Sequence, residues 1–296
     1  GLHGVVRSLP REWPSIQATS IHLDSDQVPN AGALIIDQWT SADQSPDVYF
    51  NENGRNIPVF SEAKEAHDWT PAPDETVLIS GGTRGIGLQI ARHLVELGCK
   101  TILLGRNTPK DEAKSFIESH PNQVQLALAD VTDREQLSKA LSNLNTPTAF
   151  VHCAGMLADG PIETTDAKLG QQSRRVKVDG WLNVVGLCAS TLKVAVGIGS
   201  WAGRFGNRHQ AHYAAANALL SSMASNQSGL RTTVAEFGPW SDSEMVRTIP
   251  APMQAAMRKA GVDFVGNDIG VTSIMTALQC GRGPLIMGRR IPSSSE

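Results

Sequence analysis

The fold of this 296-residue chain is decided by one stretch, Thr76-Val-Leu-Ile-Ser-Gly-Gly-Thr-Arg-Gly-Ile-Gly-Leu-Gln-Ile-Ala-Arg-His-Leu-Val-Glu-Leu-Gly98. It begins with an apolar, β-branched run typical of a buried strand, and the residues after Gly87 have the apolar spacing of a helix that ends at Gly98. The glycine-rich turn between them brings backbone N–H groups and the positive end of a helix to one place, and leaves room for a phosphate. This order predicts a dinucleotide-binding turn; the simpler alternative is a tight turn without a ligand.

The segments that follow repeat the alternation of strand and helix. We expect a helix over about 109–119, a strand over 124–129, a helix opened by a Thr132-Asp-Arg-Glu135 capping box, and strands over 148–155 and 194–199. Strands separated by helices pack into one parallel sheet with helices on both faces. The fold class is therefore α/β, a Rossmann-type doubly wound parallel sheet.

The cofactor residues are expected in the glycine turn and at the ends of the next strands. The strand after the turn ends at Arg106 instead of an acidic residue, which suits the 2′-phosphate of NADPH better than the ribose 2′-hydroxyl of NADH, although a solvated arginine is common there. Arg84 is placed to assist, Asp130 to meet the adenine ring, and Cys153 to Gly155 to meet the adenosine ribose. We predict NADPH, held by Gly81, Thr83, Arg84, Gly85, Ile86, Gly87, Arg106, Asp130, Val131, Cys153, Ala154 and Gly155.

A second stretch, from Ser200 to Asn217, carries candidate chemistry. Ser200 ends an apolar strand, where open α/β sheets bind their ligands. Tyr213 and Asn217 are four residues apart in an Ala-rich helix and share one face of it. A hydroxyl, a phenol and an amide in this arrangement favour proton transfer. The alternative for each residue alone is structural, since serine ends many strands and tyrosine commonly packs in the interior.

Residues 1–70 differ from the rest and predict a small scaffold. They contain an expected strand over Ile16–Leu23, an apolar segment over Ala31–Trp39 that is helix or strand, and a hairpin turned at Asn53-Gly54. A Pro-rich connector follows Thr70. We therefore divide the chain into a structural subdomain over 1–70, expected to be incomplete, and a catalytic domain over 71–296.

Composition gives little support for several classes of function. The net charge of −3, without a basic block, gives no support for binding nucleic acid or an anionic membrane, and no apolar run of about twenty residues is present. The four scattered cysteines suggest neither a disulfide framework nor a zinc site and suit a reducing cytoplasm. The start at Gly1 without Met suggests a piece of a longer protein, although a processed terminus would look the same.

The turn from Ser80 to Gly87 resembles that of the short-chain dehydrogenase/reductases, with Ser80 where most members have threonine. Most members also carry Tyr-x-x-x-Lys, whereas this chain has Tyr213-Ala-Ala-Ala-Asn217 and an earlier Lys177-Val-Asp-Gly. That exchange resembles the ketoreductase domains of polyketide and polyunsaturated-fatty-acid synthases. Residues 1–14 resemble the latter part of the structural subdomain that precedes such domains. Residues 237–245 resemble the segment that precedes their substrate lid, and we expect a lid near 240–265.

The resemblance implies a role for each candidate catalytic residue. Tyr213 would protonate the substrate carbonyl, and Lys177 would lower the pKa of the phenol toward working pH and hold the nicotinamide ribose. Tyr213 and Lys177 are both expected to contact the cofactor as well. Ser200 would donate to the developing oxyanion, and Asn217 would position a water or Lys177. His209 and His212 are interpreted as loop or surface residues, and no metal is expected.

The resemblance also implies the substrate and its partners. It points to a β-ketoacyl thioester on the phosphopantetheine arm of an acyl carrier protein, among neighbouring synthase domains. Two residues favour the D (3R) alcohol. Asp159 ends the stretch Met156-Leu-Ala-Asp159, and Phe205 stands five residues after Ser200, where a Trp would mark the opposite hand. The alternative for Asp159 is a plain loop residue. Trp240 and Met245 are expected to meet the substrate. A free-standing reductase of small ketones and a catalytically silent scaffold domain are the competing hypotheses.

Overall fold

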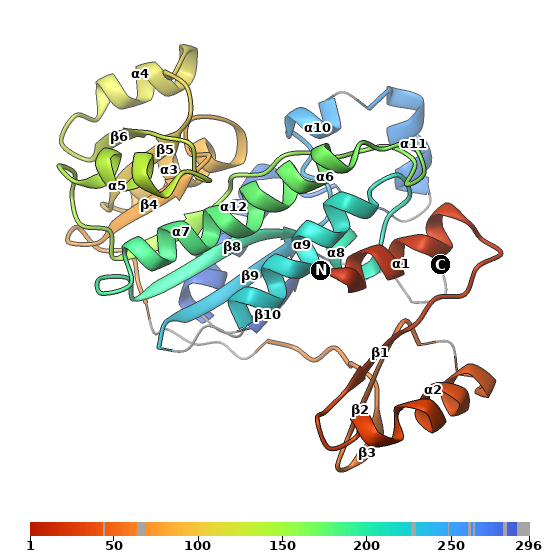
Figure 1. Cartoon of the computed structure of the whole chain (residues 1–296). Helices are drawn as coiled ribbons and strands as arrows, with labels where there is room; N and C mark the ends of the chain where they lie inside the picture. Colours follow the sequence, from red (N-terminus) through yellow and green to blue (C-terminus); the bar gives the residue numbers. More distant parts are fainter. Residues whose placement is uncertain are drawn as a thin grey trace.

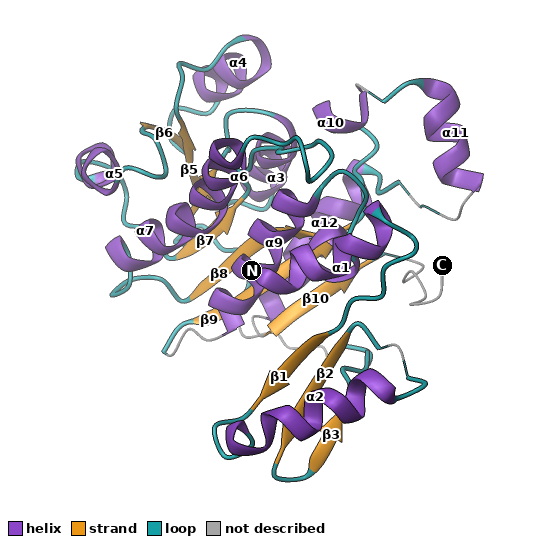
Figure 2. Ribbon diagram, turned by 45° about the vertical axis from the view of Figure 1, so that its right-hand side comes forward, coloured by secondary structure: helices purple, strands orange, loops and turns teal. Residues whose placement is uncertain are grey.

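The centre of the molecule is a twisted sheet of seven parallel strands with helices on both faces (Figures 1 and 2). The structure is a computed structural model, and it describes residues 1–43, 45–63, 69–225, 229–247, 249–259, 262, 264–280 and 283–288. The strands are β4 (Thr76–Ser80), β5 (Lys100–Gly105), β6 (Val124–Leu128), β7 (Ala149–His152), β8 (Val194–Ser200), β9 (Arg231–Phe237) and β10 (Gly283–Met287). Their spatial order is β10-β9-β8-β7-β4-β5-β6. The order reverses between β4 and β7, and such a reversal opens a crevice for a ligand at the carboxyl ends of the strands.

Each face of the sheet is covered by its own set of helices. Val77 and Ile79 of β4 belong to one apolar cluster, and Leu78 between them belongs to the other, because alternate strand residues point to opposite faces. The first cluster takes in α3 (Gly85–Glu96), α4 (Asp111–Ser119) and α12 (Asn267–Cys280), and the second takes in α5 (Arg134–Leu141), α7 (Gly180–Leu187) and α9 (Ala211–Ser225). Burial on both faces explains the near-continuous apolar runs of these strands.

The first sixty residues form a smaller unit beside this sheet. Its elements are α1 (Leu2–Glu12), β1 (Ser20–Leu23), η1 (Val28–Asn30), α2 (Ala31–Thr40), β2 (Asp47–Asn51) and β3 (Gly54–Asn56). Strands β1 and β2 pair in parallel, and β2 and β3 form an antiparallel hairpin. Helix α1 lies against α9 and the short α8 (Trp201–Phe205), so the start of the chain packs on the large domain (Figure 1).

The remaining helices lie near the carboxyl ends of the strands. They are α6 (Ala167–Arg174), the π-helical turn η2 (Arg175–Asp179), α10 (Glu244–Arg247) and α11 (Ala251–Lys259). Helix α11 buries none of its residues, as expected of a segment that stands away from the body of the domain. A lid role for residues 240–265 remains a prediction.

The predicted fold class is confirmed, while several local predictions need correction. The apolar segment Ala31–Trp39 is a helix, the hairpin at Asn53-Gly54 is present, and the strand predicted over Ile16–Leu23 is limited to its last four residues. The capping box at Thr132 is wrong, because the Asp133 side chain caps α5 by accepting from the N–H groups of Glu135 and Gln136. The domain boundary near residue 70 remains a prediction. Among the described helices, none has the length and apolar character that crossing a membrane requires.

Candidate active site

The four predicted catalytic residues converge at the carboxyl end of β8. Ser200 is the last residue of that strand, and its Oγ accepts from the backbone N–H of Ala202 at 3.2 Å. Lys177 comes from η2, and its Nζ donates to the backbone oxygen of Ile198 in β8 at 2.7 Å. Tyr213 and Asn217 come from α9, and the Ser200 hydroxyl and the Asn217 amide act on the Tyr213 phenol. One strand end, one π-helical turn and one helix therefore build the site.

Lys177 is deeply buried for a lysine. It is only 3% exposed, and burial lowers the pKa of its ammonium to about 8. The backbone of Gly155 lies against it, since a Cβ there would be 3.3 Å from Nζ. A π-helical turn carries one more residue per turn than an α-helix and often marks a functional position. Lys177 is thus held at the strand end by packing and one hydrogen bond.

The Tyr213 phenol has a higher pKa than a free tyrosine, which corrects the expectation that Lys177 lowers it. Burial is the main cause, and the charge of Asp159 adds to it, while the hydrogen-bonding groups of Asn217 and Ser200 act in the opposite direction. The ammonium of Lys177 is engaged by the Ile198 carbonyl instead. At neutral pH the phenol is therefore protonated, as a proton donor must be.

Asn217 is fixed by its own helix and offers an acceptor to the site. It is 1% exposed, and its Nδ2 donates to the backbone oxygen of Tyr213 at 2.9 Å. Its Oδ1 is buried and has no hydrogen-bond partner. This oriented acceptor fits the expected role of holding a water or the Lys177 ammonium.

The glycine turn forms a cradle at the point where the strand order reverses. Gly81 has a φ of +67°, and a Cβ there would lie 3.1 Å from the backbone nitrogen of Ala154, at the end of the neighbouring strand. A Cβ on Gly87 would lie 2.5 Å from the oxygen of Gly81, so the helix can start this close to the turn only with glycine. Gly85 has a φ of +51° and open space where its Cβ would be. Backbone N–H groups, close packing and an open face fit a pyrophosphate.

The other predicted cofactor residues border this cradle. The Arg106 side chain is 63% exposed, with Nη1 3.9 Å from Oδ2 of Asp130, so its guanidinium is accessible to a ligand. Thr83 packs on Gly105 at the end of β5, and exposed Arg84 is the N-cap residue of α3. Ile86 and Val131 pack into the core, which leaves mainly their backbone groups to face a ligand.

The loop that carries Asp159 lies next to the start of the catalytic helix. Oδ1 of Asp159 accepts from Nε2 of Gln210 at 3.0 Å, and the N–H of Gly160 donates to the His209 oxygen at 2.7 Å. Partial burial raises the pKa of the Asp159 carboxyl, which in turn acts on the pKa of Tyr213. The role of Asp159 in substrate orientation remains a prediction.

Two of the predicted substrate residues make packing contacts. Trp240 is 3% exposed and packs on Phe237 and on Gly270 of α12, which corrects the expectation that it meets substrate. Phe205 packs edge-on against Trp201 and Phe60, and its stereochemical role remains a prediction. The side chain of Met245 lies outside the part of the chain that the structure describes.

The two histidines near Tyr213 are placed differently. His209 is an exposed loop residue beside Glu12, as expected. His212, predicted to be a loop or surface residue, lies within α9 and packs half-buried against Gly170 of α6. The phenol pKa is not shifted by either ring.

One supporting residue, His152, is not among those that the sequence predicts. His152 ends β7 and is fully buried; its Nδ1 accepts from the Ser80 hydroxyl at 2.7 Å, and its Nε2 donates to the Val176 oxygen at 3.2 Å. The Ser80 oxygen in turn accepts from the N–H of Ala154 at 3.2 Å. This chain of hydrogen bonds joins the glycine turn to the segment that carries Lys177. Its signal in the sequence is a histidine that ends an otherwise apolar strand.

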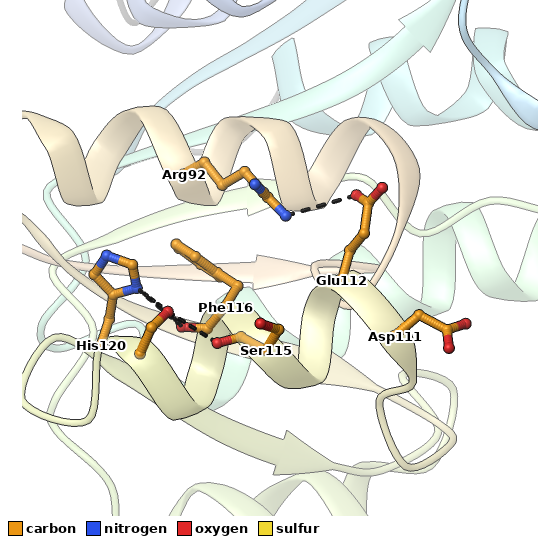
Figure 3. Close-up of a pocket in the computed structure, with 7 residues that line it drawn as sticks. Arg92, Asp111, Glu112, Ser115, Phe116 and His120 are labelled. Carbon is orange, nitrogen blue, oxygen red and sulfur yellow. Dashed lines mark hydrogen bonds and ion pairs between the residues drawn. The ribbon is translucent and has the colours of Figure 1, made fainter.

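A separate surface cavity of about 420 Å³ lies between α3 and α4, lined by Arg92, Glu112, Phe116 and His120 among others (Figure 3). Arg92 faces Glu112 at 3.6 Å and covers the Phe116 ring. None of the predicted catalytic or cofactor residues lines it.

Comparison with known sequences identifies a family for this chain. A family model for the KR domain matches residues 75–242. Erythronolide synthase EryA2 of Saccharopolyspora erythraea is 39% identical over 184 residues, which cover 58% of this chain and 5% of that protein. The spectinabilin polyketide synthase system protein NorA′ of Streptomyces orinoci is 28% identical over 305 residues, which cover 97% of this chain and 8% of that protein. The chain thus spans less than a tenth of the length of these relatives.

Solved structures share the architecture. PlmKR1, the ketoreductase from the first module of phoslactomycin biosynthesis in Streptomyces sp. HK803, superposes with a TM-score of 0.81 at 26% identity, over 96% of this chain and 69% of that one. The first ketoreductase of the tylosin PKS gives a TM-score of 0.81 at 27% identity, over 97% and 64%. The similarity extends beyond residues 75–242 into the small N-terminal unit.

Proposed function

This chain belongs to the KR domain family of the short-chain dehydrogenase/reductases, and we propose that it reduces a β-ketoacyl thioester to the 3-hydroxyacyl thioester with NADPH. The observation that carries the proposal is the convergence of Lys177, Ser200, Tyr213 and Asn217 at the end of β8. They lie on the side of the sheet where the glycine cradle opens. When bound, NADPH supplies the hydride that reduces the carbonyl carbon.

Tyr213 is the proton donor in this proposal. Its raised pKa keeps the phenol neutral at working pH, and the proton passes to the carbonyl oxygen as negative charge develops there. Ser200 donates a hydrogen bond to the same oxygen, from a rigid position fixed by its place at the strand end. Both residues thus act on one substrate atom, which lies between a strand end and a helix face.

Lys177 and Asn217 restore the proton and hold the cofactor. With its pKa lowered to about 8, the Lys177 ammonium gives up a proton more readily than an exposed lysine does. Asn217 Oδ1 is a free acceptor that can hold this ammonium or a bridging water. The Lys177 ammonium also lies where the nicotinamide ribose is expected.

NADPH fits the residues present better than NADH does. The cradle at Gly81 and Gly87 accommodates the pyrophosphate, and the exposed Arg106 guanidinium pairs with a 2′-phosphate. No acidic side chain ends β5 to hold a ribose 2′-hydroxyl, because Arg106 follows that strand.

The substrate is proposed to arrive on a carrier protein. The two curated relatives described above are polyketide synthases, and synthases of this kind hold intermediates as thioesters on the phosphopantetheine arm of an acyl carrier protein. We accordingly expect an acyl carrier protein and neighbouring synthase domains as partners. Asp159, whose charge acts on the Tyr213 phenol, favours the D (3R) alcohol in this proposal.

Turnover with a β-ketoacyl pantetheine thioester tests this proposal, with the product identified by mass and by chiral chromatography. The expected product is the D-3-hydroxyacyl thioester. The L alcohol would contradict the role given to Asp159, while faster turnover of small free ketones would favour a free-standing reductase. Bound NADPH without any turnover, even on a carrier-bound substrate, would indicate a silent scaffold domain.

A further inference from the structure

We propose that His3, His22 and Asp47 form a binding site for a divalent transition-metal ion such as Zn²⁺, at the junction of α1 with the small sheet. The three residues come from α1, β1 and β2, elements that Figure 2 labels, and none of them is among the predicted active-site residues. The site is independent of the proposed reduction.

The ligand atoms are close enough together to share one ion. One atom from each residue lies within 4.8 Å of the other two, and Nε2 of His22 is 3.7 Å from Oδ1 of Asp47. Two ligands on a tetrahedral Zn²⁺ are separated by about 3.4 Å, since each lies about 2.0–2.1 Å from the metal. The His22–Asp47 pair therefore needs little adjustment, and the partly exposed His3 side chain makes the larger movement.

The two ligand atoms from the sheet have no hydrogen-bond partner. The Asp47 side chain is only 4% exposed, yet its Oδ1 makes no hydrogen bond, and neither does Nε2 of His22. An unpaired buried carboxylate oxygen is costly, and native structures rarely leave one unsatisfied. An ion that accepts both atoms as ligands would satisfy them together.

Neighbouring side chains already fix both ligands. Arg7 donates from Nε to Oδ2 of Asp47 at 2.8 Å, which orients the carboxylate and leaves Oδ1 as the available oxygen. Tyr49 stacks on the His22 ring, with centroids 4.1 Å apart and planes inclined by 10°. Metal ligands are commonly held by outer contacts of this kind. The Arg7 charge lowers affinity for the ion, so we expect moderate binding.

The donor set and its surroundings define the class of ion. Two imidazoles and one carboxylate suit Zn²⁺ and other borderline divalent metals better than Ca²⁺ or Mg²⁺, which prefer oxygen ligands. A cavity of about 200 Å³, lined by His3, Arg7 and Tyr49 among others, borders the site and has room for water as a further ligand. Bound metal would connect α1 directly to the small sheet.

Zinc titration of the full chain, without a polyhistidine tag, tests the site. Isothermal titration calorimetry should give one Zn²⁺ per chain, and Co²⁺ should produce a visible ligand-field spectrum that Zn²⁺ abolishes. His3→Ala should weaken Zn²⁺ binding at least about 10-fold, since it removes a direct ligand. Zn²⁺ should raise the melting temperature of the wild type and not of this variant.

The matched control is His93→Ala. His93 also lies beside a carboxylate, with Nδ1 3.7 Å from Glu96, but within the described chain it belongs to no group of three close ligands. Its replacement should leave the affinity unchanged. The proposal fails if the wild type binds no Zn²⁺, or if one-to-one binding survives His3→Ala or is lost in His93→Ala. Loss of Zn²⁺ binding in a folded His22→Gln variant would support the proposed site. If His22→Gln does not fold, the Zn²⁺ affinity of His3→Ala decides whether the proposal holds.

Discussion

At the scale of the residue, His152 shows how a buried polar group supports the predicted site. It is fully enclosed between Ser80 and the Val176 carbonyl, and because that carbonyl can only accept, Nε2 carries a proton. Burial, followed by the charge of Lys177, lowers the pKa of His152 to about 3. The folded state therefore resists protonation of this ring over most of the acid range.

The depressed pKa of His152 predicts loss of stability in acid. Between about pH 6.5 and pH 3 the unfolded chain binds a proton at this position and the folded chain does not, so this residue removes about 1.4 kcal/mol of unfolding free energy per pH unit as the pH falls. Urea unfolding between pH 7.5 and pH 4.5 measures this slope. His152→Gln should flatten it, whereas His209→Gln, which changes an exposed histidine, should not. Equal slopes in the wild type and His152→Gln would contradict the assignment.

Arg106 is predicted to set the preference for NADPH. Arg106→Ala removes a charge-assisted hydrogen bond to the 2′-phosphate, and such a bond contributes about 1.5–3 kcal/mol, so NADPH affinity should fall roughly 10- to 100-fold. NADH affinity should stay the same. Arg92→Ala, on the far portion of α3, is the control. Equal losses for both cofactors would show that Arg106 does not contact the 2′-phosphate.

At the scale of the element, α1 and the catalytic helix are in unusually close contact. A Cβ on Gly4 would lie 2.3 Å from the backbone oxygen of Ala214, the residue after Tyr213. Gly206, with a φ of +69°, likewise lies against the backbone of Arg7. The first helix of the chain therefore helps to define where the catalytic helix lies.

A pair of glycine substitutions measures the importance of this contact. Gly4→Ala should destabilise the protein by about 1–3 kcal/mol, because the added methyl group meets the α9 backbone. Gly32→Ala is the matched control: Gly32 is also helical but has open space around the same position, so it should be neutral or stabilising by up to about 1 kcal/mol. Urea unfolding gives both values. Similar effects of the two substitutions would rule out a tight α1–α9 contact.

Most elements are predictable from sequence because their signals are local. The glycine turn before α3 and the apolar strands were recognisable from spacing alone. The cap of α5 was misplaced by one residue because Thr132 instead donates its hydroxyl to Asp130, a local competition that the motif does not reveal. Trp240 was misassigned because its burial depends on Gly270 of α12, thirty residues later.

At the scale of the whole molecule, Arg7 joins three elements that are far apart in sequence. Its Nε donates to Asp47 of β2 and its Nη1 to the Gly203 oxygen of α8 at 2.7 Å, and the ion pair is almost wholly buried. No sequence pattern links these positions. For the same reason, the chain of hydrogen bonds through Ser80 and His152, and the raised pKa of Tyr213, could only be found from the structure.

Breaking this connection should loosen the small unit from the large domain. Arg7→Met leaves the buried Asp47 carboxylate without its cation and should cost about 3–5 kcal/mol of unfolding free energy. Arg7→Met with Asp47→Asn should recover part of the loss, because no uncompensated charge remains. Thermal and urea unfolding of the two variants provide the comparison. A double variant no more stable than Arg7→Met would show that the ion pair is not the source of the effect.

The central claim is that Tyr213 gives the proton to the reduced carbonyl, and its direct test is the rate of NADPH consumption with a β-ketoacyl pantetheine thioester in the wild type and in Tyr213→Phe. Removing a positioned proton donor costs about 10²–10⁴-fold, so kcat should fall by at least about 100-fold. NADPH binding, followed by fluorescence, should be nearly unchanged, because the glycine cradle and Arg106 remain intact. A Tyr213→Phe variant that binds NADPH and turns over at the wild-type rate would contradict the claim.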